Sequence, residues 1–347
     1  MTLVETLVVA AIVVLLMALI LPAIQKVRAS SYRLDCANNL RQLGIAAHTF
    51  HGDHGRLPPG YLGPSLAKNV MFPAMYFEGQ WVGHLPLLLP YLEEDALFHQ
   101  IKVDFNLSVV SPAKWFWSAP AQGPGLPNVA NYTVAMKQLK VFRCPSATNF
   151  AAQIGDPSPT GGGTVLGLHV FNNPSFGPFT VGWKDEYGPA NQFRPLGRTN
   201  YLGVAGCGSG TDPVYAKFEG IYTNRSNHSL GQLAAQDGTS NTLLYGETCG
   251  SFWSGSPPYT YDICWMAAGS LGTYFGLQPG PKASTIVFSS NHAAGVQFCF
   301  ADGSVRIVRF GETRWDQVSS QSSDWLLLQQ LAGIHDGGPA DASALVD

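Results

Sequence analysis

The sequence predicts an α+β fold in which a long N-terminal α-helix packs on an antiparallel β-sheet head with long loops. One observation is the uncharged, almost wholly apolar run from Thr6 to Gln25, which an amphipathic pattern follows. Another is the rest of the chain, where short apolar runs alternate with turn residues; the 347 residues include 38 Gly and 24 Pro. Such punctuation is typical of strands and loops. We therefore expect an apolar helix over 1–24, its amphipathic continuation over 25–54, and a head over 55–347.

The apolar half of the helix is long enough to cross a bilayer. About 20 helical residues at about 1.5 Å each span a hydrocarbon core of roughly 30 Å. Glu5 is the one acid in this segment, and a carboxylate at the edge of an apolar region is costly unless a cation pairs with it. The chain's own amino terminus lies a turn away, so the amino terminus of a neighbouring chain in a staggered bundle is the better partner. Pro22 lacks an amide hydrogen and is expected to kink or locally open the helix.

The continuation of the helix has one apolar side. Apolar residues recur there at spacings of three and four, which predicts a helix that packs on a sheet. The stripe consists of Ala29, Tyr32, Cys36, Leu40, Leu43, Ala47 and Phe50. The helix is expected to end near His51–Gly55, ahead of a Pro-Pro-Gly sequence.

The head is expected to consist of short strands. The predicted strands are Leu139–Phe142, Asn200–Val204, Thr242–Glu247, Thr285–Ser289, Val296–Ala301 and Val305–Phe310. The fourth and fifth of these runs are expected to form a pair. Asp302-Gly303 lies between the last two runs and predicts a hairpin turn.

Other parts of the head are predicted to be helical or irregular. Leu85–Leu92 is interrupted by two prolines and predicts a short buried helix or strand. Ser111–Asn131 is rich in proline, glycine and tryptophan and is expected to be an exposed loop. A short amphipathic C-terminal helix is predicted over Ser323–Leu331, ended by Gly333.

The six cysteines favour an exported protein with disulfides. None forms a C-x-x-C motif, so a zinc or thioredoxin-like interpretation lacks its sequence signature. An even number allows up to three disulfides in fifteen pairings. We expect Cys36 to pair with Cys144 and Cys249 with Cys264, which leaves Cys207 and Cys299 as the remaining candidates. The alternative is six buried free thiols.

The charge composition fits an extracellular particle better than a highly charged cytosolic enzyme. Charged residues make up 12% of the chain, which predicts a loop-rich surface with few salt bridges. The net charge of −3 provides no basic footprint for nucleic acid.

The N-terminal pattern resembles the processed N-terminus of type IV pilins and pseudopilins. The resemblance rests on the run from Met1 to Glu5 and on a proline at position 22 of the apolar helix. It implies that a prepilin peptidase cleaves before Met1 and methylates the new amine, and that Glu5 neutralises the N-terminus of an adjacent subunit. The alternatives are a plain signal anchor and a removable secretory signal.

Basic residues after the apolar run conflict with export. Lys26, Arg28 and Arg33 would place the following region in the cytoplasm by the positive-inside rule. Prepilins carry their orienting positive charge on a leader, which a processed chain has lost. The resemblance therefore implies an inner-membrane precursor that is later assembled at the cell surface.

Motifs along the chain resemble those of a large pilin-like family that is abundant in planctomycete bacteria. They are Cys36-Ala-Asn-Asn-Leu-Arg-Gln-Leu-Gly44, Phe142-Arg-Cys-Pro-Ser146, Asp237-Gly-Thr-Ser-Asn-Thr242 with Glu247, and His292 followed by nine residues and Asp302-Gly303. The resemblance covers nearly the whole chain and implies a prepilin-type N-terminus and an exported head.

Four residues of these motifs are candidates for a site: Asp237, Glu247, His292 and Asp302. Oxygen ligands from loops would suit extracellular calcium, and a His–Asp pair would suit a general base. The simpler interpretation is that the two aspartates form turns and cap backbone groups. Since G-x-S-x-G and Walker motifs are absent from the sequence, no enzyme activity is predicted.

We expect a structural subunit of an extracellular type IV pilus-like filament. Its partners would be copies of itself, the prepilin peptidase and methyltransferase, and a pilus or type II secretion assembly machinery. The alternatives are a pseudopilin of a type II secretion system and a membrane-anchored extracytoplasmic binding module or enzyme.

Overall fold

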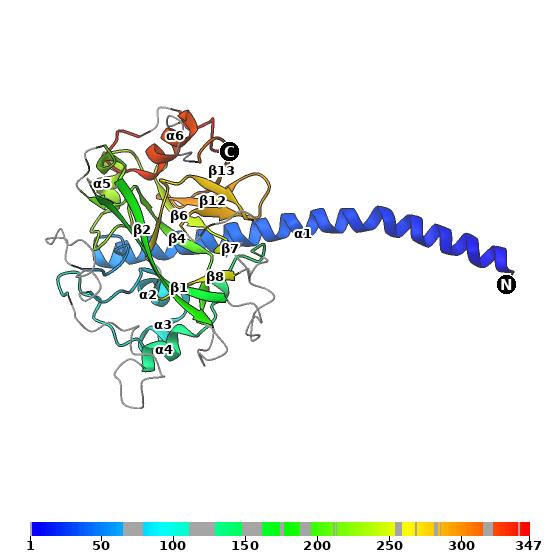
Figure 1. The fold of residues 1–347 in the computed structure, drawn as a ribbon, viewed down its shortest axis with the longest axis horizontal. Coiled ribbons are helices and arrows are strands. Elements are labelled where there is room, and N and C mark those ends of the chain that lie inside the picture. The colour runs from blue at the N-terminus through cyan, green and yellow to red at the C-terminus, as the bar shows by residue number, and fades with distance from the viewer. Residues whose placement is uncertain are drawn as a thin grey trace.

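The computed structural model shows one long helix that projects from a rounded head (Figure 1). It describes residues 2–64, 79–110, 129–147, 162–173, 177–187, 196–210, 212, 214–253, 259–267, 269–280, 284, 286–314, 322–338 and 341–347. A long N-terminal helix followed by a region of mainly antiparallel sheets is the predicted α+β arrangement.

Helix α1 runs without interruption from Leu3 to His54. Gly55 ends it in a left-handed conformation with φ of 69°, and the Gly55 N–H donates to the His51 carbonyl at 2.8 Å, within the predicted range. The helix continues through Pro22 and bends gently in Figure 1, so the expected local opening is absent from α1. Proline removes one hydrogen bond, and its fixed φ is compatible with a helix.

Burial of α1 begins at Cys36, where the helix meets the head. The buried residues are Cys36, Leu40, Leu43, Gly44, Ala46, Ala47 and Phe50. They confirm the predicted stripe from its third member onward. Ala29 is exposed and Tyr32 is half-buried, because both lie on the part of α1 that precedes the head.

The five-stranded sheet against which α1 packs has the order β13-β12-β6-β4-β9. Its strands are β4 (Tyr201–Gly206), β6 (Leu243–Glu247), β9 (Ser270–Gly272), β12 (Val296–Phe300) and β13 (Val305–Val308). All neighbours are antiparallel except β9, which runs parallel to β4. Among the strands of this sheet, α1 contacts β12 and β6 most, so the stripe of α1 faces the middle of the sheet.

A second sheet has the order β2-β1-β8-β3, with β5 paired to β1 and β7 paired to β8. Its strands are β1 (Gly162–Asn173), β2 (Gly177–Tyr187), β3 (Arg198–Thr199), β5 (Ser209–Gly210), β7 (Ser251–Trp253) and β8 (Tyr259–Cys264). Strands β10 (Leu277–Pro279) and β11 (Phe288–Ser290) form a parallel pair of their own.

Short helices connect and cover these sheets. The α-helices are α2 (Leu85–Leu88), α3 (Asp95–Phe98), α4 (Val129–Ala135), α5 (Leu230–Ala235) and α6 (Ser323–Ala332). The 3₁₀ helices are η2 (Leu89–Leu92), η4 (Lys140–Phe142) and η6 (Ala216–Phe218). Helix α6 confirms the predicted C-terminal helix, and Gly333 is its C-cap.

Local predictions in the head differ in outcome. The Asp302-Gly303 hairpin joins β12 to β13, with Gly303 at φ of 83°. The strand predicted over Leu139–Phe142 is wrong, because this segment forms η4. The expected pair of β11 with β12 is also wrong: β11 pairs with β10, while β12 pairs with β6 and β13. The loop predicted over Ser111–Asn131 lies outside the described residues as far as 128, and it is wrong for its last three residues, which form the start of α4.

Gly44 lets α1 approach β12 closely, which makes a testable prediction. A Cβ at Gly44 would lie 2.6 Å from the buried Cys299 Sγ, whereas a Cβ at Gly52 would meet nothing within 4 Å. Gly44→Ala should destabilise the protein by about 1–2 kcal/mol, since overpacking outweighs the gain in helix propensity. Gly52→Ala should stabilise it by about 0.5–1 kcal/mol. Urea unfolding of the detergent-solubilised chain measures both changes.

The clash also has an internal control. Adding Cys299→Ala to Gly44→Ala removes the sulfur that the new methyl group meets, so the double variant should lose less stability than the two single changes together. Strict additivity of the two changes would contradict close packing at this point.

Candidate functional site

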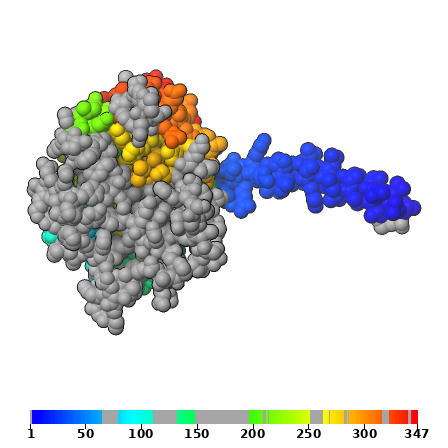
Figure 2. All heavy atoms as spheres, in the orientation of Figure 1, coloured from blue at the N-terminus to red at the C-terminus, as the bar shows by residue number. Residues whose placement is uncertain are grey.

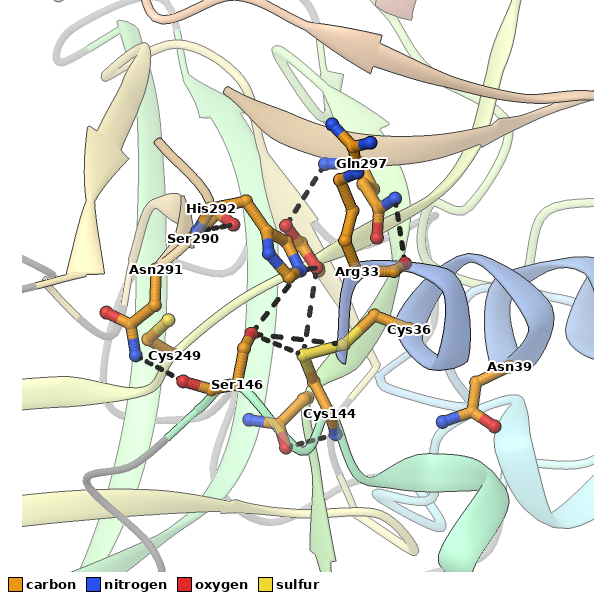
Figure 3. A network of polar contacts seen from close by, with 12 residues as sticks. Arg33, Cys36, Asn39, Cys144, Ser146, Cys249, Ser290, Asn291, His292 and Gln297 are labelled. Atoms are coloured by element: carbon orange, nitrogen blue, oxygen red, sulfur yellow. Dashed lines mark hydrogen bonds and ion pairs between the residues drawn. A yellow bond between two sulfur atoms is a disulfide. The ribbon is translucent and has the colours of Figure 1, made fainter. Parts of the chain in front are cut away.

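The place where α1 enters the head is marked by a disulfide. Cys36, the first buried residue of α1, is bonded to Cys144 in the segment after η4. The two Cα atoms are 5.1 Å apart, and the sequence separation of the two cysteines is 108. The predicted Cys36–Cys144 pair is therefore confirmed, and it joins the helix covalently to the head (Figure 3).

Polar side chains surround this disulfide (Figure 3). Ser146 Oγ lies 2.9 Å from Cys144 Sγ and 3.3 Å from His292 Nε2. The Asn291 side-chain amide donates to the Ser146 carbonyl at 2.6 Å. The loop after β11, which carries Asn291 and His292, is thereby held against the segment that carries Cys144.

Glu247 and His292 form a buried pair beside the sulfurs. Glu247 Oε2 is 3.6 Å from His292 Nε2, and Glu247 Oε1 accepts the Gln297 N–H at 3.1 Å. Burial raises the pKa of Glu247 from 4.5 to about 8. Burial, and then the positive charge of Arg33, lower the pKa of His292. Both shifts favour the uncharged forms, a neutral imidazole beside a protonated carboxyl.

Asparagine side chains complete the junction between α1 and the sheet. The Asn39 amide donates to the Arg143 carbonyl at 2.9 Å and to the Tyr201 hydroxyl at 3.3 Å. The Asn200 side chain accepts the Cys144 N–H at 2.9 Å and donates to the Thr248 carbonyl at 2.9 Å. A force on α1 is thus passed through one covalent bond and several hydrogen bonds to β4 and β6.

The four candidate residues of the sequence motifs do not form one site in the structure. The structure brings Glu247 and His292 together at the disulfide. The Asp237 carboxylate instead accepts the N–H groups of Asp336 and Gly337, and Asp302 accepts the Ser304 N–H at 2.8 Å within its hairpin turn. The two aspartates therefore have the capping role of the simpler interpretation.

The expected Cys249–Cys264 disulfide is wrong, since both residues are buried free thiols. Strands β7 and β8 pair with Ser251 opposite Tyr261. Extending this register by two residues sets Cys249 level with Ile263, and neighbouring strand residues face opposite sides of a sheet. Cys207 and Cys299 are likewise buried free thiols.

The far end of α1 is the second candidate site. Thr2 and Glu5 form a capping box, in which the Thr2 N–H donates to Glu5 Oε2 at 2.9 Å and the Glu5 N–H donates to Thr2 Oγ1 at 3.4 Å. The T-x-x-E spacing of Thr2 and Glu5 is the sequence signal for this box, which gives Glu5 a local role besides its charge. By length and composition α1 can cross a membrane, and none of its most apolar stretch of 18 residues is buried.

A known family matches most of the chain. A family model described as "Protein of unknown function (DUF1559)" matches residues 25–309. The chain belongs to this family. No curated protein and no solved structure matches it. The family membership and the N-terminal apolar helix together are consistent with a pilin-like surface protein. The match begins at residue 25 and so does not cover the apolar half of α1. The interpretation of that half depends on its own sequence and helical structure.

The buried Glu247 of this DUF1559 member predicts a pH dependence of stability. Its carboxyl has a folded pKa of about 8 against an ordinary 4.5, so the folded state binds more protons between these values. Stability should therefore be full below pH 4.5 and fall, by on the order of 5 kcal/mol, as the pH rises through 8. Glu247→Gln, which is neutral at every pH, should flatten this part of the profile.

Urea unfolding of the detergent-solubilised chain at a series of pH values tests this dependence. The informative quantity is the difference between the wild-type and Glu247→Gln profiles, because other groups titrate equally in both proteins. Parallel profiles between pH 4.5 and 8 would show that Glu247 is ionised in the folded protein.

Proposed function

We propose that this chain is a structural subunit of an extracellular type IV pilus-like filament that polymerises through the exposed part of α1. The proposal depends on one observation: the N-terminal part of α1 is exposed and projects from the head like a rod (Figure 2). The 33 residues from Leu3 to Asp35 precede the first buried position and extend about 50 Å at 1.5 Å per residue.

From Thr6 to Ile24 this rod exposes apolar side chains on all sides. Leu3 is 79% exposed, Leu19 69% and Val27 70%. A contiguous apolar surface of this size marks contact with lipid or with other chains. A bilayer core accounts for about 30 Å of it. A bundle of identical helices would also bury this apolar stretch, and that burial supplies the driving force for assembly.

Glu5 supports a staggered arrangement in the bundle. Its Oε2 atom accepts the Thr2 N–H, and the carboxylate retains lone pairs for a second donor. The positively charged amino terminus of a neighbouring subunit would pair with it and would select one axial register. The role of the chain is then non-enzymatic: a prepilin peptidase processes it in the inner membrane, and an assembly machinery adds it to the filament.

Fractionation of cells tests this function. The chain should be abundant in material sheared from the cell surface, while an inner-membrane marker protein stays with the cells. Retention of the chain in the envelope would contradict an extracellular filament. That result would favour a pseudopilin of a type II secretion system or a membrane-anchored module.

A further inference from the structure

The cluster where α1 enters the head gathers four side chains of metal-binding type. Cys36, Cys144, Glu247 and His292 each offer one ligand atom, and these atoms all lie within 4.8 Å of one another. All four residues are buried. We propose that these four side chains bind one Zn²⁺ ion in a tetrahedral site when the Cys36–Cys144 disulfide is reduced.

The distances between the ligand atoms fit such a site. With Zn–N and Zn–O bonds of about 2.0–2.2 Å and Zn–S bonds of about 2.3 Å, the edges of a tetrahedron are about 3.3–3.8 Å. Glu247 Oε2 lies 3.6 Å from His292 Nε2 and 4.0 Å from Cys144 Sγ. The two sulfurs can move apart once their bond is broken. Since the four ligand atoms already lie within 4.8 Å of one another, rotation of the side chains can bring them to the distances of a tetrahedral site.

The surroundings already orient the two ligands that are not cysteines. The Gln297 N–H holds Glu247 Oε1, which directs Oε2 towards His292 and Cys144. The His292 N–H donates to Ser290 Oγ at 2.9 Å and so fixes the backbone of the loop. Partners of this kind are typical of metal sites, where they position the ligands.

The reaction balances in two steps. A dithiol supplies two electrons and two protons, breaks the Cys36–Cys144 bond and leaves as a disulfide. Zn²⁺ then displaces the two thiol protons and the proton of Glu247, while His292 binds as a neutral imidazole. The product carries a net charge of −1, which the nearby Arg33 offsets; its charge already acts on His292. The disulfide and the metal site are therefore mutually exclusive states of one cluster.

Cobalt provides the direct test, because tetrahedral Co²⁺ bound to thiolates has intense absorption bands. The full-length chain in detergent is titrated with Co²⁺, both oxidised and after reduction with a phosphine. We expect one Co²⁺ per reduced chain, a spectrum of two thiolate ligands, and displacement by Zn²⁺. The oxidised chain should not show these bands.

Variants identify the ligands. Glu247→Gln and His292→Ala should each weaken binding to the reduced chain by at least about 10- to 100-fold. Asp302→Asn, in the hairpin turn, and Cys249→Ala, a buried thiol outside the cluster, should leave the affinity unchanged. Unaltered binding in the Glu247→Gln/His292→Ala double variant, or loss of binding in Cys249→Ala, would overturn the proposed site.

Folding of the reduced chain is followed by near-UV circular dichroism. If reduction loosens the head, Zn²⁺ should restore the signal of the wild-type chain and not that of His292→Ala, since metal binding and folding are coupled. A reduced chain that is folded but binds no Co²⁺, or a loosened chain that Zn²⁺ does not restore, would also overturn the proposal.

Discussion

Replacing Glu5 by glutamine is expected to abolish filament assembly while the head stays folded. Glutamine keeps the capping box, because its amide oxygen can accept the Thr2 N–H in the same way. It removes only the negative charge, so the amino terminus of the neighbouring subunit would be buried without a partner. Leaving one charge of a buried pair uncompensated costs about 3–5 kcal/mol, which weakens each subunit addition by more than about 100-fold.

The capping box offers a matched control for this variant. Thr2→Val removes the hydroxyl that accepts the Glu5 N–H and leaves the charge of Glu5 in place. Filaments should therefore form from Thr2→Val and not from Glu5→Gln, when sheared material is counted by electron microscopy. Normal filaments from Glu5→Gln would refute the charge pairing. A defect in Thr2→Val with normal filaments from Glu5→Gln would show that Glu5 acts by capping its own helix.

Removing the Cys36–Cys144 disulfide is expected to cost about 4–5 kcal/mol of stability. The bond closes a loop with a sequence separation of 108, and on the chain-entropy model a loop of about 100 residues contributes about 4.7 kcal/mol. The Cys36→Ser/Cys144→Ser variant should unfold at much lower urea concentration than the wild-type chain. Its stability should not change further when a reductant is added.

The buried free thiols provide the control for this experiment. Cys249→Ser/Cys264→Ser removes no crosslink, so this variant should keep the sensitivity to reductant of the wild-type chain. Its own loss of stability should come from burying two hydroxyl groups. A wild-type chain whose stability is indifferent to reductant would contradict the clamping role of the Cys36–Cys144 bond.

The elements that could be predicted from the sequence depend on local signals. The end of α1 follows from Gly55, the β12–β13 turn from Asp302-Gly303, and the end of α6 from Gly333. The buried stripe of α1 follows from helical periodicity. Each of these signals lies within a few residues of the feature that it determines.

The remaining features depend on pairing between distant segments. Strands β1 and β2 were not predicted, because the glycines in Gly162–Asn173 and Gly177–Tyr187 lower their strand propensity and pairing with each other decides their structure. The wrong Cys249–Cys264 pair has the same origin, since the register of β7 and β8 is invisible in a single sequence.

The cluster at the disulfide shows this limit most clearly. The spacing of the cysteines argued against a zinc site, because metal motifs in sequences are recognised by short intervals. Here the ligand-type residues come from α1, from the segment after η4, from β6 and from the loop after β11. The sequence motifs that contain these residues can be recognised, but the sequence does not show that the four side chains lie together in the fold.

Cryo-electron microscopy of filaments sheared from cells, with mass spectrometry of their N-terminus, tests the central claim most directly. We predict a core of α1 helices in which the Glu5 carboxylate lies within hydrogen-bond distance of the methylated amino terminus of Met1 in a neighbouring subunit, and heads on the outside. A chain found only in membranes, unmethylated and without filaments, or filaments with α1 outside the core, would contradict it.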